Sequence, residues 1–327
     1  MYNIQIGIKN LSQLLTKVQD KLKELLDNKC IVYPLNASFR QLVKLIPDNF
    51  KIILPIQLSI PRIGHTAVLV NENILFSGSK NNLTSQQLYS INSNSFTAKA
   101  NLNPGKYEHA GCNVNNNVLL NGGYPNGGAI QQLYNIISDS FTTKANLSGT
   151  TYDHTCITID DNSVLICGGF PNLQTSQKLY NINSDSFIIK ANINPGRIVH
   201  SSVLINSNSV LISFGNGTNT QNTQQIYNME TNIFINKVNS SVSRMSHTGV
   251  YTRGSVLFSG GESTDSGKSQ QLYNITSDSF TTKANLDPNR NWHKAVNVKE
   301  NILISGGNYA PSIHESYILD LDEFHRG

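Results

Sequence analysis

Residues 154–191 read HTCITIDDNSVLICGGFPNLQTSQKLYNINSDSFIIKA and contain four short runs of strand-forming residues separated by turn residues. An alternating run follows His154, and a second, apolar run ends in Gly168-Gly169. The third run carries Tyr180, and the fourth begins at Phe187 after a polar turn. Short alternating runs bounded by Asn, Asp, Ser and Gly predict four antiparallel strands joined in sequence order.

The same pattern recurs six times along the chain. Histidines mark each copy at spacings of 44 to 47 residues: His65, His109, His154, His200, His247 and His293. Tyrosines keep the same rhythm: Tyr89, Tyr134, Tyr180, Tyr227, Tyr273 and Tyr317. A phenylalanine follows each tyrosine by seven residues. Four strands in a unit of about 40–50 residues are typical of a propeller blade. The sequence therefore predicts an all-β, six-bladed β-propeller over residues 50–327.

The repeated residues resemble the kelch repeat. That family has an arginine and then a histidine, as in Arg197 and His200, an apolar strand ending in two glycines, and a tyrosine followed seven residues later by tryptophan. This chain has phenylalanine at every tryptophan position, and two of its glycine pairs are altered, to Gly78-Ser79 and Phe214-Gly215. The resemblance implies the fold and says little about the ligand.

Closure of the ring is predicted from the two ends of the repeats. The last repeat ends three residues after Phe324, which is too soon for a full fourth strand. Residues 51–58 read KIILPIQL, and Ile52 lies 13 residues before His65, as Phe141 lies 13 residues before His154. We therefore expect residues 50–58 to supply the outer strand of the last blade and to protect its edge.

Residues 1–49 are predicted to form a separate helical module. Its apolar side chains recur at spacings of three and four residues: Ile8, Leu11, Leu15, Val18, Leu22 and Leu25. A second short helix is expected to begin at Ser38 and to end before Pro47. The module is either a cap on the propeller or an assembly and docking element, whose contacts would be Leu11, Leu15, Val18, Leu22 and Leu25. Fewer than three heptads are too short for a stable isolated coiled coil.

The segment from Cys30 to Phe39, with Leu45-Ile46 after it, resembles the N-terminal modules of some bacteriophage tail and fibre proteins. The resemblance implies a virion tail protein that is assembled in the host cytoplasm and has other tail or baseplate proteins as partners. A homo-oligomer formed through the N-terminal helix would fit a fibre. The sequence shows no signal peptide, and no apolar run approaches the 18 residues of a membrane helix.

The charge and cysteine content bear on nucleic-acid binding and on disulfide bonding. Charged residues make up 14% of the chain, against about 25% in an average domain. Residues 1–60 carry eight Lys/Arg and four Asp/Glu, and residues 61–327 carry 17 of each. Because residues 61–327 have no net charge, no basic surface for a phosphate backbone is expected, and nucleic acid is not an expected partner. The four cysteines lack CxxC spacing and are predicted to be free thiols.

The six repeated histidines are predicted to be structural. Residues at one repeat position lie around a ring, each in its own blade, and not in a cluster as metal ligands do. Kelch propellers include the copper enzyme galactose oxidase, but its ligand set has no counterpart in this sequence. No catalytic constellation stands out from the repeats. We therefore expect a protein without catalytic residues, cofactor or metal.

Ligand binding is expected where the repeats differ. The loops between second and third strands and between fourth and first strands open on one face, where aromatic rings can stack on sugars and polar groups can bond hydroxyls. The predicted ligand-binding residues are Tyr107, Tyr124, Tyr152, Phe170, Arg197, Arg244, Arg290, Trp292 and Tyr309. The function expected is recognition of a host cell-surface glycan, a protein receptor or another tail protein by a phage tail protein. The alternatives are a cytoplasmic kelch-type interaction scaffold and an extracellular carbohydrate-active oxidase.

Overall fold

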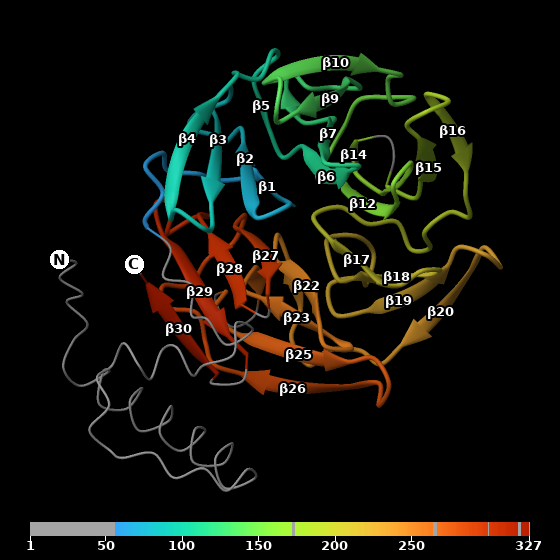
Figure 1. The fold of residues 1–327 in the computed structure, drawn as a ribbon. Helices are drawn as coiled ribbons and strands as arrows, with labels where there is room; N and C mark the ends of the chain where they lie inside the picture. The colour runs from blue at the N-terminus through green and yellow to red at the C-terminus, as the bar shows by residue number, and fades with distance from the viewer. Residues whose placement is uncertain (1–55, 172–173, 264–266, 300, 320–321, 327) are drawn as a thin grey trace, which may run out of the picture. The chain divides into compact units, whose positions relative to one another are not determined.

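The computed structural model describes residues 56–327, apart from 172–173, 264–266, 300, 320–321 and 327. These residues belong to one compact unit, Ile52–Gly327. In it, six four-stranded antiparallel sheets surround a common axis (Figure 1). The prediction of an all-β, six-bladed propeller is confirmed. The helical module predicted for residues 1–49 lies outside the described residues and stays a prediction.

The strands run outward from the axis in chain order (Figure 1). The first strands are β1 (Thr66–Val70), β6 (Ala110–Val114), β12 (Thr155–Asp160), β17 (Ser201–Asn206), β22 (Thr248–Thr252) and β27 (Lys294–Val298). The second strands are β2 (Asn73–Ser77), β7 (Asn117–Asn121), β13 (Ser163–Cys167), β18 (Ser209–Ser213), β23 (Ser255–Ser259) and β28 (Asn301–Ser305). The third strands are β3 (Gln86–Ser90), β9 (Gln131–Asn135), β15 (Gln177–Asn181), β19 (Gln224–Asn228), β25 (Gln270–Asn274) and β29 (His314–Ile318). The fourth strands are β4 (Ser95–Lys99), β10 (Ser140–Lys144), β16 (Ser186–Ile189), β20 (Ile233–Lys237), β26 (Ser279–Lys283) and β30 (Glu323–Arg326).

Three pairs of two-residue strands connect the loops on one face of the ring. They are β5 (Lys106–Tyr107) with β8 (Tyr124–Pro125), β11 (Thr151–Tyr152) with β14 (Phe170–Pro171), and β21 (Arg244–Met245) with β24 (Glu262–Ser263). Each pair joins the segment that enters a blade to the loop that follows the second strand of the same blade. These pairs fix the loops in which ligand binding is expected.

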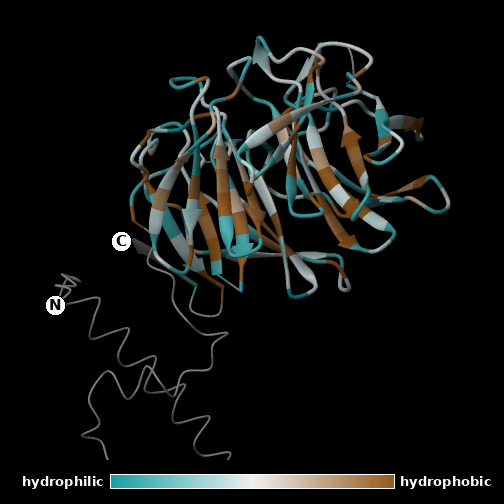
Figure 2. Cartoon of the chain, turned by 45° about the horizontal axis from the view of Figure 1, so that its top comes forward, coloured by the Kyte–Doolittle hydropathy of each residue, from teal (hydrophilic) through white to brown (hydrophobic). Residues whose placement is uncertain are grey.

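Burial follows the position of each strand in its blade. The second strands are almost entirely buried, as in β18 and β23, whereas the fourth strands are mostly exposed, as in β10. Hydrophobic residues accordingly lie on the strands inside the blades, and hydrophilic residues lie at the turns and loops (Figure 2). A sheet with both faces covered by neighbouring blades explains why the second strands are continuous apolar runs.

Neighbouring blades share apolar cores. Leu75 of the first blade and Tyr134 of the second belong to one such core. The last and first blades meet in the same way, with Leu303 and Phe76 in a core that also includes Leu58. The buried core is therefore a closed ring of six inter-blade layers, and no blade can bury its faces alone.

The repeated tyrosines form a second link between blades. Tyr180 donates its hydroxyl proton to Asp185 Oδ1 at 2.5 Å, and the same oxygen accepts the backbone N–H of Ala145 in the preceding blade at 2.8 Å. The arrangement occurs at all six junctions, with the acceptors Asn94, Asp139, Asp185, Asn232, Asp278 and Asp322. At the junction of the last and first blades, the backbone donor is Ile56.

The expectation that the C-terminus is too short for a fourth strand is wrong. β30 pairs with β29, and Phe324 lies opposite Tyr317, as Phe141 lies opposite Tyr134. Four residues after the turn are enough, as β16 also shows. Residues 50–55 of the predicted closing strand lie outside the described residues. Leu58 donates its N–H to the carbonyl of Ser312 in the last blade at 2.9 Å.

The prediction of free thiols is wrong for two of the cysteines. Cys112 of β6 and Cys156 of β12 form a disulfide between the second and third blades. They come together because the first strands of adjacent blades are neighbours at the axis. Cys167 is free and buried.

Candidate functional site

A closed ring of backbone hydrogen bonds surrounds the axis. The residue before each repeated histidine donates its N–H to the carbonyl of the equivalent residue in the preceding blade, at 2.6–3.1 Å. All six residues have a left-handed backbone, with φ between 47° and 63°. In order, they are Gly64, Glu108, Asp153, Val199, Ser246 and Trp292. Because this backbone is unfavourable for a β-branched residue such as Val199, the ring itself must hold these residues in place.

The six predicted structural histidines are buried beside this ring. His109 Nε2 lies 2.8 Å from Thr66 Oγ1 of the preceding blade, and His154 Nε2 lies 2.5 Å from Asn121 Oδ1. His200, His247 and His293 bond hydroxyl groups of preceding blades in the same way. Burial lowers the pKa of His154 and of His200 to about 3, so both rings are neutral at pH 7. For these five histidines, the partner of Nε2 is thus a side chain of the preceding blade.

The glycine pairs make room for these histidines. A Cβ on Gly122 would lie 2.6 Å from His154 Cε1, and a Cβ on Gly123 would lie 2.7 Å from His109 Cβ. Both glycines also have positive φ. Each pair is therefore packed between the histidine of its own blade and that of the next.

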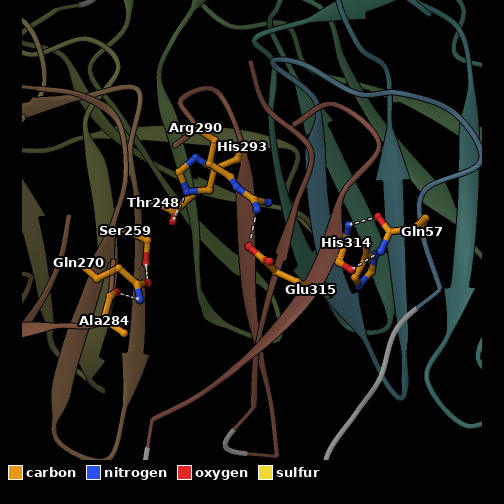
Figure 3. Close-up of polar contacts among 9 residues, drawn as sticks. All are labelled: Gln57, Thr248, Ser259, Gln270, Ala284, Arg290, His293, His314 and Glu315. Carbon is orange, nitrogen blue, oxygen red and sulfur yellow. Dashed lines mark hydrogen bonds and ion pairs between the residues drawn. The ribbon is translucent and has the colours of Figure 1, made fainter. Parts of the chain in front are cut away.

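The three arginines predicted on the ligand-binding face are buried, which corrects that part of the prediction. Arg197 and Arg244 donate from Nη1 to the carbonyls of Phe214 and Gly260, each at 2.8 Å. Arg290 forms a buried ion pair with Glu315 (Figure 3). These side chains turn into their own blades because carbonyl or carboxylate oxygens are gathered there, and a buried cation needs such partners. They are not available to a ligand at the surface.

The predicted aromatic residues of the second and third blades form a continuous row. Tyr107 contacts Tyr124 across β5 and β8, with ring centroids 5.6 Å apart. Tyr124 contacts Tyr152 of the next blade at 5.5 Å, and Tyr152 contacts Phe170 at 5.5 Å. Tyr124 is 46% exposed and Phe170 is 38% exposed. We call Tyr107, Tyr124, Tyr152 and Phe170 the aromatic row.

A cavity of about 70 Å³ opens at the axis beside this row. Its lining includes all six members of the backbone ring, together with Thr155, Lys294 and five of the repeated histidines. The row and the cavity are close together, because a Cβ on Gly64 would lie 3.3 Å from Tyr107 Cδ2.

The cavity brings two carboxyl groups and one ammonium group together. Burial raises the pKa of Glu108 to about 7. Burial, reinforced by the nearby Glu108, raises the pKa of Asp153 to about 8. Burial lowers the pKa of Lys294, while the two acids oppose that change. Perturbed titratable groups in a concave site are a common mark of binding or catalysis.

Sequence reasoning missed these three residues, although a signal existed. The position before the histidine holds an acid only in the second and third repeats, at Glu108 and Asp153. The position after the histidine holds Thr, Ala or Ser in five repeats and lysine in the sixth, at Lys294. These departures from the repeat are thus visible in the sequence, but the sequence alone does not show that the three positions share one cavity at the axis.

The last two predicted residues lie apart from the aromatic row. Trp292 lines the cavity and donates from Nε1 to Glu262 Oε1 at 3.2 Å. Tyr309 lies in the loop between β28 and β29 and is 73% exposed. The structure therefore joins four of the predicted residues in one row, places Trp292 at the axis, and leaves Tyr309 in a loop of the last blade.

Within the described part of the chain, no group of three or more His, Cys, Asp or Glu side chains is arranged to hold a metal ion. No helix among the same residues is long and apolar enough to cross a membrane.

No protein-family model matches this sequence, and no curated protein matches it. Solved structures do match the fold, among them the structure of YjhT, with a TM-score of 0.71. The match covers 83% of this chain and 99% of YjhT, at 10% sequence identity. Similarity at this level of identity shows a shared propeller fold and carries no information about the ligand.

Proposed function

We propose that this protein is a non-enzymatic receptor-binding component of a bacteriophage tail, whose kelch-like propeller recognises a host cell-surface glycan. The observation that carries the recognition step is the aromatic row. Its rings extend over two adjacent blades, and Tyr124 and Phe170 offer exposed faces. Aromatic faces stack on the apolar faces of pyranose rings, and neighbouring polar groups bond the hydroxyls.

The surface composition supports a neutral ligand of this kind. Only 14% of the residues are charged, and residues 61–327 carry equal numbers of basic and acidic residues. Such a surface relies on hydrogen bonds more than on ion pairs. The phage context rests on the resemblance of residues 30–46 to tail and fibre modules, and those residues lie outside the described part. Tail, baseplate or lysis genes beside the coding gene would support this context, and a metabolic operon would contradict it.

Binding is tested with an array of bacterial surface polysaccharides and the full-length chain. We expect a subset of glycans to bind, and Tyr124→Ala with Phe170→Ala to weaken that binding at least tenfold. Tyr251→Ala is the matched control, because Tyr251 is a similarly exposed tyrosine, 39% accessible, on β22. Unchanged binding by the double variant, or no binding to any polysaccharide, would overturn the proposal. Glycan masses should stay constant after incubation, since no catalytic step is proposed.

A second candidate, a protein-interaction scaffold, is favoured by a different surface. The fourth strands of the third and fourth blades expose isoleucines where the first, second and fifth blades carry serine, threonine or alanine. Ile188 and Ile189 of β16 are 57% and 79% exposed, and Ile233 and Ile235 of β20 are 58% and 57% exposed. Adjacent exposed apolar side chains on edge strands are typical of protein contacts. Light scattering of Ile189→Thr with Ile235→Thr, compared with the unmodified chain, tests whether this surface drives association.

A further inference from the structure

Two tyrosine–acid dipeptides occupy the same repeat position in adjacent blades, Tyr107-Glu108 and Tyr152-Asp153. The tyrosines belong to the aromatic row, and the acids belong to the backbone ring that lines the axial cavity. The equivalent dipeptides of the other blades are Ile63-Gly64, Ile198-Val199, Met245-Ser246 and Asn291-Trp292. An aromatic ring beside a carboxyl group is therefore particular to the second and third blades.

The charges of the cavity do not balance. Glu108 and Asp153 supply two carboxyl groups, and Lys294 supplies one ammonium group. The histidines in the lining add no positive charge near pH 7, because burial keeps their pKa far below the usual value. Lys80 attracts Glu108 electrostatically but is exposed and outside the lining. With both carboxyls ionised, the cavity is one positive charge short. Their pKa values of about 7 and about 8 keep protons on them in the empty cavity near neutral pH. A second cation that enters would lower both pKa values and pair with the ionised groups.

The size of the cavity decides which part of a ligand can enter. About 70 Å³ is room for a few water molecules, whereas pockets that enclose a whole ligand measure about 300–1,000 Å³. A group as small as an ammonium fits, and a pyranose ring does not. A sugar ring would have to remain at the mouth, where Tyr107 and Tyr152 lie. Aromatic faces also attract an ammonium group directly.

We infer that the axial cavity binds the ammonium group of an amino sugar, held by Glu108 and Asp153 while the sugar ring rests on the aromatic row. The ligand class is therefore a glycan with free amino groups. This inference rests on the proposed function, because it assumes that the row binds a sugar.

The test uses isothermal titration calorimetry of the full-length chain with two pentasaccharides at pH 7.5, where the Glu108 carboxyl is mostly ionised. One is fully deacetylated chitosan pentamer, and the other is the acetylated chitin pentamer of the same length. We expect the chitosan pentamer to bind at least tenfold more tightly than the chitin pentamer. Glu108→Gln with Asp153→Asn should abolish this preference. Glu72→Gln is the matched control, because Glu72 is an exposed acid in the turn between β1 and β2, remote from the cavity lining.

Each remaining outcome has a defined meaning. Equal binding of both pentamers, unaffected by the acid variants but lost in Tyr124→Ala, overturns the inference and leaves the proposed function standing. Binding of neither pentamer overturns the inference, and the polysaccharide array then decides the proposed function separately. Trilysine serves in the same assay as a peptide with free amino groups. If trilysine binds and requires Glu108 and Asp153 while chitosan does not bind, the ligand is a peptide amine and the glycan assignment is overturned. If the double variant does not fold, the single variants Glu108→Gln and Asp153→Asn are compared instead.

Discussion

The side-chain amide of Gln57 forms two hydrogen bonds with the backbone of His314. Its Nε2 donates to the carbonyl oxygen at 3.4 Å, and its Oε1 accepts the N–H at 3.3 Å (Figure 3). In the third blade, the equivalent carbonyl, that of Gln177, accepts the backbone N–H of Lys190 at the end of the fourth strand. A side chain near the start of the propeller thus takes over, in the last blade, hydrogen bonding that the backbone supplies elsewhere.

This closure predicts a difference between two truncations. Deleting residues 1–48 keeps Ile56, Gln57 and Leu58 and should leave the thermal melt of the propeller unchanged. Deleting residues 1–60 removes them and should lower the melting temperature clearly. Leu58 is 4% exposed, so Leu58→Ala alone should cost about 2–5 kcal/mol. Gln57 is exposed, and Gln57→Ala should cost below about 1 kcal/mol. Equal melts for both truncations would refute the closure.

Alanine substitutions at Gly122 and Gly149 should differ in their effect on the stability of the propeller. A Cβ on Gly122 would lie 2.4 Å from the carbonyl oxygen of Thr151, at a φ of 60°, so Gly122→Ala should cost several kcal/mol, of order 2–4. A Cβ on Gly149 meets nothing within 4 Å. Gly149→Ala should therefore be neutral or stabilise by up to about 1 kcal/mol. Urea denaturation of both variants measures the difference, and similar midpoints would be inconsistent with the packing described.

The loss of stability on disrupting the buried ion pair of the last blade should depend on which partner is removed. Arg290→Met leaves the Glu315 carboxylate buried without this partner and should cost about 3–5 kcal/mol. Glu315→Gln should cost less, because Gln271 Oε1 accepts from Arg244 Nη2 at 3.2 Å at the same position of the fifth blade. Removing both charges with Arg290→Met and Glu315→Leu should cost less than the two single variants together. Strict additivity in chemical denaturation would argue against coupling.

Stability should depend on pH in two opposite ways. The buried histidines have lowered pKa values, to about 3 for His154 and His200. Below pH 6.5 the unfolded chain binds more protons than the folded one, so stability falls as pH decreases from 6.5 toward 3. Glu108 and Asp153 have raised pKa values, so the folded state retains their protons and stability falls as pH rises from about 4 toward 7 or 8.

Melting temperatures between pH 4 and 9 would separate the two effects. The histidines outnumber the acids, so we expect the melting temperature to rise up to about pH 6.5 and then to decline. Glu108→Gln with Asp153→Asn should remove the decline above pH 6.5. A decline that persists in this variant would have to come from groups other than Lys294, because the lowered pKa of Lys294 makes stability rise with pH.

Repetition explains why the sequence predicted the blades well. Tyr180 and Gly122 occupy positions that most blades fill for the same packing reason, so each pattern could be checked against five other copies. Arg197 was misplaced because a side chain at the entry to a blade can point to solvent or inward, and the carbonyls that attract it come from residues 17 to 26 positions later. Glu108 and Lys294 are 186 positions apart in the sequence and share one cavity only after the ring has closed.

The backbone ring that passes through Gly64, Asp153 and Trp292 takes one donor and one acceptor from every blade. Such a ring has no first or last member, although the polypeptide itself is interrupted between the last and first blades. Around the axis, the link across that interruption is the same kind of hydrogen bond as the link between any other two blades. The axial hydrogen bonds therefore do not depend on which blade comes first in the chain. Circularly permuted chains that start at another blade should form the same ring.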